Sequence, residues 1–243
     1  MRVLVTRPEP DATALRTHLV AAGHEVFIEP LLTMTYMPID PEDIIDAQAL
    51  IATSRNGLRA LAASDAWEAM RELPVFTVGP GTAAEARALG MINVMPGPRS
   101  ARELIPIISE VAEVNAGPLI HLAGETLAFD LGAELVTLGF HVLQPVVYRS
   151  IAKDSLTDAT VARMTAGGLD AVILLSPQTA AIYARLVRLH GLEAVAHGLT
   201  HVCLSEAVAN QLSALGVPLR MVADQPNLEE ILGLVGSLAA QSG

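Results

Sequence analysis

The chain has 243 residues, 51% of them hydrophobic and 17% charged, which favours a sizeable core and argues against intrinsic disorder. A net charge of −11 and a pI near 5.0 argue against nucleic acid as a partner, because phosphate contacts need clustered Lys and Arg. No apolar run reaches the roughly 18 residues of a membrane helix, and one cysteine, Cys203, excludes an internal disulfide, so we expect a soluble cytoplasmic protein without a membrane partner.

Short apolar runs alternate with amphipathic helical patterns along the whole chain. The runs predict strands at residues 3–5, 25–28, 50–52, 75–78, 92–95, 119–122, 141–147, 171–175, 201–204 and 219–222. The patterns between them predict helices at residues 10–23, 82–90, 100–114, 126–139, 177–191, 206–216 and 227–240. Such alternation is typical of parallel sheets covered by helices, so the predicted fold class is α/β.

Three pairs of segments recur in the same order along the chain. Residues 1–33 resemble residues 117–150, residues 49–61 resemble residues 171–184, and residues 75–97 resemble residues 201–223. The period of about 115 to 125 residues is the size of a domain. The repeat therefore predicts two similar α/β domains, each a parallel sheet flanked by helices.

Two proline-containing stretches, "IEPLLTMTYMP" and "LQPVVYRS", occupy matching places in the repeat. If they pair as antiparallel strands, at about residues 33–38 and 145–150, the chain crosses between the domains twice. One domain then combines residues 1–35 with 150–243, and the other is inserted as residues 38–147. This arrangement predicts a two-stranded antiparallel linker beside an interdomain cleft.

Hydroxyl side chains and glycines directly follow several predicted strands. Ligands of parallel α/β sheets bind at the carboxyl ends of strands, where helix N-termini present free N–H groups. A Ser or Thr there can instead cap the helix, and Ser176 followed by Pro177 fits a cap. Because the feature recurs in both halves, we expect a cleft lining that suits a large polycarboxylate. The candidate binding residues are Arg7, Thr53, Ser54, Arg55, Gly79, Thr82, Ser176, Gln178 and Ser205.

Other chemistry finds little support in the sequence. His197 and His201 are four residues apart, but Gly198 lies between them and no third ligand is evident, so no metal site is predicted. The glycines of residues 79–90 lack the spacing of a dinucleotide fingerprint. His121 ends a predicted strand, where a structural role is favoured over a functional one, and Cys203 is expected in the core.

Tyr148 ends a predicted strand at the start of the expected linker. A phenol is protonated at neutral pH and can donate its proton to a leaving hydroxyl. An amphipathic residue at a domain edge explains the same pattern equally well.

Taken together, these motifs resemble the uroporphyrinogen-III synthase family. The matching segments, in order, are "VTRP", "ATSRNG", "TVGPGTA", "GE" after the strand at residues 119–122, "VVYRS" and "LLSPQT". The resemblance runs nearly end to end and implies two α/β domains joined by a two-stranded linker. It also implies a cofactor-free lyase that cyclises hydroxymethylbilane, a linear tetrapyrrole with eight carboxylates. The product is uroporphyrinogen III, formed with loss of water and inversion of the terminal pyrrole ring.

The resemblance also implies roles for particular residues. Tyr148 assists departure of the hydroxyl as water, and strand-end hydroxyls hold the carboxylates of the substrate. Arg7 and Arg55 are added here on charge grounds. The expected form is a monomer, and the enzyme that produces hydroxymethylbilane is a candidate partner.

Two segments depart from the family pattern. Residues 205–209 read "SEAVA" where the family has Gly-x-x-Thr-Ala, and His121 stands where the family has arginine. A second hypothesis therefore stays open, a two-lobed tetrapyrrole-binding or regulatory module that has lost turnover. A third and weaker one is a two-lobed solute-binding protein.

Overall fold

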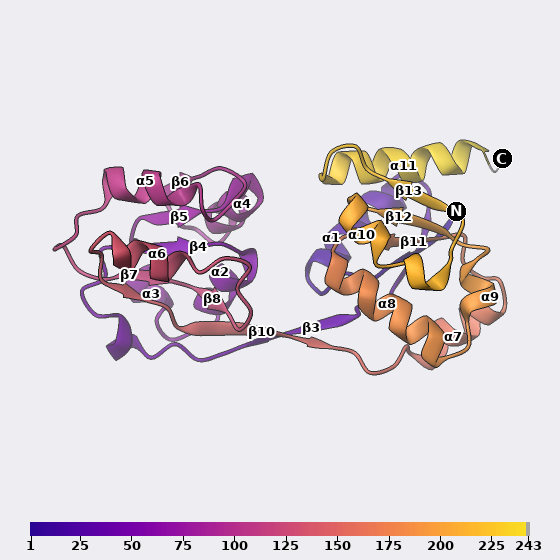
Figure 1. The fold of residues 1–243 in the computed structure, drawn as a ribbon, viewed down its shortest axis with the longest axis horizontal. Coiled ribbons are helices and arrows are strands. Elements are labelled where there is room, and N and C mark those ends of the chain that lie inside the picture. The colour runs from indigo at the N-terminus through magenta and orange to yellow at the C-terminus, as the bar shows by residue number, and fades with distance from the viewer. Residues whose placement is uncertain (242–243) are drawn as a thin grey trace. The chain divides into compact units, whose positions relative to one another are not determined.

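The computed structural model describes residues 1–241, which form two compact units (Figure 1). Unit 1 combines Met1–Thr33 with Ile151–Gly243, and unit 2 is Met34–Ser150. Each unit contains a five-stranded parallel sheet flanked by helices, which confirms the predicted α/β class. No helix in the described part of the chain is long and apolar enough to cross a membrane.

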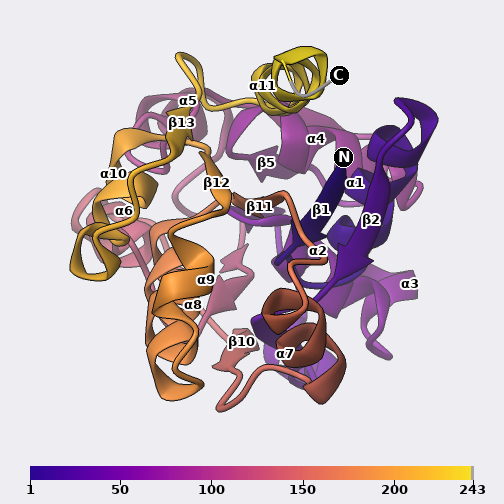
Figure 2. The same ribbon diagram turned by 90° about the vertical axis from the view of Figure 1, so that its right-hand side faces the viewer.

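The sheet of unit 1 has helices on both faces, because alternate residues of its strands point to opposite sides. Leu4 and Val172 pack with one set of helices, whereas Val3 and Val5 pack with the other. The strand order, visible in Figure 2, is β13 (Arg220–Val222), β12 (Thr200–Cys203), β11 (Ala171–Leu174), β1 (Arg2–Val5) and β2 (Glu25–Ile28). The first face carries α7 (Asp158–Thr165), α8 (Pro177–Leu189), α9 (Glu193–Ala196), α10 (Glu206–Asn210) and the 3₁₀ turn η2 (Ser213–Leu215). The second face carries α1 (Asp11–Ala21) and α11 (Leu228–Gln241).

Unit 2 repeats this arrangement. Its strand order is β6 (Val94–Pro96), β5 (Val75–Thr77), β4 (Ala49–Ala52), β7 (Leu119–His121) and β9 (Val142–Leu143). One face carries the 3₁₀ turn η1 (Pro41–Ile44), α2 (Arg55–Ala62), α3 (Trp67–Met70) and α4 (Gly79–Ala88). The other face carries α5 (Leu104–Val111) and α6 (Leu131–Thr137).

The two sheets agree strand for strand with the sequence repeat. Strands β4, β5 and β6 correspond to β11, β12 and β13, and strands β7 and β9 correspond to β1 and β2. The registers agree as well, because Ala49 pairs with Leu119 just as Ala171 pairs with Val3. In both sheets the strand order reverses at one place, between β4 and β7 in unit 2 and between β1 and β11 in unit 1. Such switch points are where open α/β sheets bind ligands.

A smaller three-stranded sheet has the order β3 (Leu32–Tyr36), β10 (Val146–Ala152) and β8 (Ala123–Gly124). The chain passes from unit 1 to unit 2 within β3 and returns at the Ser150–Ile151 bond within β10. The N–H of Lys153 donates to the carbonyl of Leu31 at 3.0 Å, and the N–H of Met37 donates to that of Val147 at 2.8 Å.

Several predicted elements are wrong in extent. The strand expected at residues 141–147 is two strands, β9 and β10, because Pro145 cannot donate to a strand ladder. The helix expected at residues 126–139 begins only after Asp130, whose side chain accepts from the N–H of Ala133 and caps α6. The helix expected at residues 206–216 is the short α10 followed by a 3₁₀ turn, and helices α3, α7 and α9 were not predicted.

Candidate functional site

Three polar side chains meet at the switch point of unit 2. Thr53 follows β4, His121 ends β7, and Gln144 follows β9. The Thr53 hydroxyl lies 3.2 Å from Nε2 of His121, and Nδ1 of His121 lies 2.7 Å from Oε1 of Gln144. These three residues, called the switch-point triad below, come from three adjacent strands of the parallel sheet.

The geometry fixes the proton on His121. Burial lowers the pKa of this histidine, and the hydrogen bond that its ring donates to Gln144 and the charge of Asp130 oppose that shift without cancelling it. The neutral ring donates Nδ1–H to the amide oxygen of Gln144, so Nε2 accepts a hydrogen bond. The acceptor Nε2 therefore takes the hydrogen of the Thr53 hydroxyl.

Tyr148 lies beside the same strand end. Strand β8 follows β7 after a single residue, and it pairs with β10 so that Tyr148 is opposite Gly124. The Tyr148 ring packs directly over this glycine, because a Cβ built on Gly124 would stand 2.6 Å from Cζ and 2.8 Å from the hydroxyl oxygen of Tyr148. Glycine at position 124 is therefore what lets the phenol approach the backbone.

The strand-end serines act mainly as helix caps. Ser54 accepts from the N–H of Asn56 at 3.2 Å and begins α2, and Ser176 accepts from the N–H of Thr179 at 3.1 Å and begins α8. The Ser176 hydroxyl also donates to the Thr179 hydroxyl at 2.8 Å. Ser205 precedes α10 but makes no capping hydrogen bond through its side chain. Ser205 is thus the member of this set whose side chain has no role in starting its helix.

In the glycine-rich turn after β5, the backbone N–H of Gly79 and the side chain of Thr82 are not openly exposed. Gly79 has a positive φ of 69°, which favours glycine, and its N–H donates to the carbonyl of Pro98 at 2.8 Å. Thr82 lies in the first turn of α4 and is buried. Thr77, at the end of β5, is fully buried, and its hydroxyl has no hydrogen-bond partner among the described residues.

In unit 1, Arg7 and Gln178 lie at the corresponding switch point, after β1 and β11, whereas Ser205 follows β12. Arg7 follows β1 and forms an ion pair with Asp11 at 2.8 Å, and Gln178 is exposed in the first turn of α8. Thr6 is fully buried and donates to the carbonyl of Ile173 at 2.8 Å, so its hydroxyl has a structural role. The cleft expected between the domains stays a prediction.

The two histidines considered as metal ligands have other partners. Nε2 of His197 lies 2.7 Å from the carbonyl oxygen of Leu215, and Nε2 of His201 lies 3.3 Å from the hydroxyl of Tyr183. Among residues 1–241, no three His, Cys, Asp or Glu side chains are grouped closely enough to hold a metal ion. Cys203 is a buried free thiol in β12, as predicted.

The structure places Thr53 and Arg55 after β4, and His121 ends the neighbouring strand β7. Sequence reasoning missed Gln144 altogether. Gln144 is 23 residues from His121, and a single glutamine after a short strand gives no pattern that marks it. The position of His121 at a strand end was the available signal.

Comparison with known proteins identifies the family of this chain. The model of the family "Uroporphyrinogen-III synthase HemD" matches residues 13–233. The structure of uroporphyrinogen-III synthetase from Helicobacter pylori is similar with a TM-score of 0.64 at 20% identity, over 98% of this chain and 100% of that one. A mutant uroporphyrinogen III synthase from Thermus thermophilus gives a TM-score of 0.53 at 15% identity, over 100% of both chains. A search of curated proteins finds no match.

The structural neighbours share the fold, and the family model covers most of the sequence. The chain belongs to the uroporphyrinogen-III synthase family, the cyclising lyases that convert hydroxymethylbilane to uroporphyrinogen III in tetrapyrrole biosynthesis.

Proposed function

We propose that Tyr148 is the catalytic residue of this cyclisation and donates its proton to the hydroxyl that leaves the bilane. The hydroxyl departs as water with the electron pair of the broken C–O bond, and the electrophilic carbon left behind is attacked in ring closure. The observation that carries the proposal is the packing of the Tyr148 ring over Gly124, beside the switch point of unit 2. General-acid assistance of this kind contributes about 10²- to 10⁴-fold to a rate.

The carboxylates of the substrate require hydrogen-bond donors, and the strand ends supply them. In unit 2 we assign this role to Thr53, Ser54, Arg55, Gly79 and Thr82. In unit 1 we assign it to Arg7, Ser176, Gln178 and Ser205, and for Ser176 the role falls to the helix start that it caps, because its hydroxyl hydrogen is bonded to Thr179. The capping bond of Ser54 uses an oxygen lone pair and leaves its hydrogen for a ligand. For Gly79 the role falls to the turn it forms, because its own N–H is bonded to Pro98.

Fixing the substrate is itself a large part of this catalysis. A flexible bilane can close in more than one way, so the rate and the isomer both depend on which carbon is held against the electrophile. Donors that are already oriented by helix caps and strand ends lose little freedom when they bind a carboxylate. This supports a mechanism based on positioning by the protein's own residues.

We also propose that the two units are separate domains joined by the paired strands β3 and β10. The hydrogen bonds between Leu31 and Lys153 and between Met37 and Val147 support an antiparallel linker, because the residue numbers run in opposite directions. The proposed working form is a cytoplasmic monomer that takes its substrate from the enzyme producing hydroxymethylbilane. The single, buried cysteine supports a reducing compartment.

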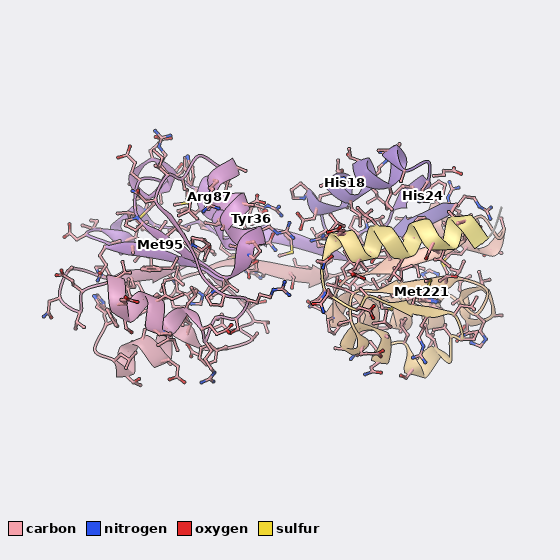
Figure 3. The ribbon with its side chains drawn as sticks, turned by 90° about the horizontal axis from the view of Figure 1, so that it is seen from above. His18, His24, Tyr36, Arg87, Met95 and Met221 are labelled. Carbon is pink, nitrogen blue, oxygen red and sulfur yellow. The ribbon has the colours of Figure 1, made fainter. Side chains whose placement is uncertain are left out.

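The test of the catalytic role is Tyr148→Phe, which removes one oxygen and keeps the ring. Turnover should fall at least about 100-fold, while the free energy of unfolding should change by less than about 1 kcal/mol. Tyr36→Phe is the matched control, because it removes the same atom from a tyrosine of β3 that has no assigned part in the reaction. It should leave turnover unchanged (Figure 3 labels Tyr36). Wild-type turnover in Tyr148→Phe would remove Tyr148 from the mechanism.

The same assay separates the second hypothesis. Hydroxymethylbilane is generated in the reaction mixture, and binding of the tetrapyrrole is measured by calorimetry. Affinity without turnover in the wild-type protein would favour a binding or regulatory module. The departure of residues 205–209 from the family pattern motivates this hypothesis, because Glu206 in the first turn of α10 repels a carboxylate that would otherwise be held there.

A further inference from the structure

The switch-point triad of unit 2 has an apolar counterpart in unit 1. The strand registers place His121 opposite Ile51 and Val5 opposite Ile173, so His121 corresponds to Val5. By the same registers Thr53 corresponds to Leu175 and Gln144 to Ile28. Val5, Ile28 and Leu175 all pack in one apolar cluster. The fold therefore does not require polar side chains at these three positions.

Other residues of unit 2 are adapted to the polar triad. A Cβ built on Gly132 would stand 2.5 Å from Oε1 of Gln144, so the absence of a side chain on α6 makes room for the amide that holds His121. His121 itself is fully buried. A buried, hydrogen-bonded polar group that the fold does not need gains little net stability, which points to a role in binding.

The proton on His121 decides what Thr53 can offer a ligand. With the ring neutral, the Thr53 hydrogen is engaged by Nε2, and the hydroxyl presents only lone pairs to the strand end. A carboxylate cannot bind to lone pairs. With the ring protonated, Nε2–H donates to the Thr53 oxygen, and the Thr53 hydrogen turns outward as a donor.

We propose that a carboxylate of the substrate binds at Thr53 together with uptake of one proton by His121. His121 is then a positioning residue, which acts through Thr53 and does not touch the substrate. This inference rests on the proposed role of Thr53 in substrate binding. It adds that binding of a substrate carboxylate at Thr53 is coupled to protonation of His121.

The surroundings of His121 are consistent with such coupling. The neighbouring strand ends present Thr53 and Gln144, which do not titrate, and the charge that acts on the ring is that of Asp130 at the start of α6. Burial keeps the imidazole neutral in the free protein. A carboxylate at Thr53 adds a second negative charge near the ring and favours the imidazolium.

The experiment measures KM for hydroxymethylbilane, generated in the reaction mixture, at several pH values between about 6.5 and 8.5. The substrate carboxylates are ionised throughout this range. In the wild-type protein KM should increase as the pH increases, because binding consumes a proton. The increase should approach, but not exceed, about tenfold for each pH unit. His121→Gln can hydrogen-bond but cannot take up that proton, so its KM should be nearly independent of pH.

Three further variants make the test decisive. His201→Gln alters another fully buried histidine, which lies within β12 and not after its carboxyl end, and should keep the wild-type slope. Thr53→Val should flatten the slope as His121→Gln does, and Thr53→Ser should restore it. The threonine pair decides the matter should His121→Gln fail to fold.

The outcomes distinguish the two proposals. A wild-type protein that makes uroporphyrinogen III with a flat pH profile of KM would overturn the proton coupling and leave the proposed function intact. The coupling would also be overturned by a wild-type slope that survives in both His121→Gln and Thr53→Val. Failure of the wild-type protein to cyclise the bilane would count against the proposed function itself.

Discussion

At the scale of single residues, two buried histidines differ in the hydrogen-bond partners of their ring nitrogens. His121 has a partner on each ring nitrogen, whereas Nδ1 of His201 has none among the described residues. Burial lowers the pKa of His201 to about 4. His201 stacks edge-on against Tyr183, with ring centroids 5.5 Å apart, inside the core of unit 1. We interpret it as a structural residue that makes stability depend on pH.

The pH dependence has a definite sign. Above the ordinary histidine pKa of 6.5, His201 is neutral in both the folded and unfolded states and has no effect. Between pH 6.5 and 4 the unfolded state takes up a proton that the folded state refuses, so the free energy of unfolding falls as the pH falls, by up to about 3 kcal/mol. His201→Gln should remove this contribution to the fall in the free energy of unfolding on acidification.

The measurement is urea unfolding of both proteins at pH 7 and pH 4.5. His18→Gln, on the exposed side of α1 (Figure 3), is the control and should behave as the wild type does. An equal loss of stability on acidification in wild type and His201→Gln would contradict the assignment.

At the same scale, sequence reasoning identified residue types better than their partners. The hydroxyls after the strands were predictable, because strand ends and helix starts have clear patterns. Their hydrogen-bond partners were not predictable. The Ser176 hydroxyl donates to Thr179 and the N–H of Gly79 donates to Pro98, and both bonds depend on loop geometry that no local pattern encodes. The triad needs three strands in register, and pairing between distant strands cannot be read from one sequence.

At the scale of elements, the pairing of β8 with β10 makes Gly124 a second test of the catalytic proposal. Gly124→Ala would place a Cβ within 2.6 to 2.8 Å of the ring and hydroxyl of Tyr148. The end of a side chain can move more easily than a backbone, so the ring should shift while the fold persists. Turnover should fall at least about tenfold, since misplacing a catalytic group by about 1 Å costs up to 10²-fold.

The measurement is steady-state turnover of Gly124→Ala with thermal unfolding beside it. Gly236→Ala, in α11, is the control, because a Cβ there meets no atom within 4 Å. Normal turnover in Gly124→Ala would show that the placement of the Tyr148 ring does not matter to the reaction.

A helix cap gives an independent prediction for α8. Ser176→Ala removes the acceptor for the N–H of Thr179 and should lower the free energy of unfolding by about 1 kcal/mol, whereas Ser176→Gly should cost only a few tenths. Denaturant unfolding of both variants provides the check. Equal stability of wild type and Ser176→Ala would contradict the capping role.

Element boundaries show why part of the fold escaped prediction. The apolar pattern of residues 141–147 continues through Gln144 and Pro145, yet the chain leaves one sheet there and enters another. The helical pattern of residues 126–139 starts five residues before the Asp130 cap permits a helix. Periodicity locates an element, but proline and capping residues set its ends.

At the scale of the whole molecule, the duplication was the most predictive feature of the sequence. The three repeated segment pairs correspond to two sheets with the same strand order, each with its own switch point. The pairs also show where the copies have diverged, because polar side chains of unit 2 replace apolar ones of unit 1. The net charge was less informative about the ligand. The chain has a net charge of −11, yet it belongs to a family whose substrate is itself an anion.

The central claim is that this protein directs hydroxymethylbilane to one isomer, and the direct measurement is the ratio of uroporphyrinogen isomers formed with and without it. The bilane is generated in the reaction mixture, and the products are separated after oxidation to porphyrins. We predict isomer III as the main product with the protein present and isomer I in its absence. Isomer I as the main product in both mixtures would contradict the account.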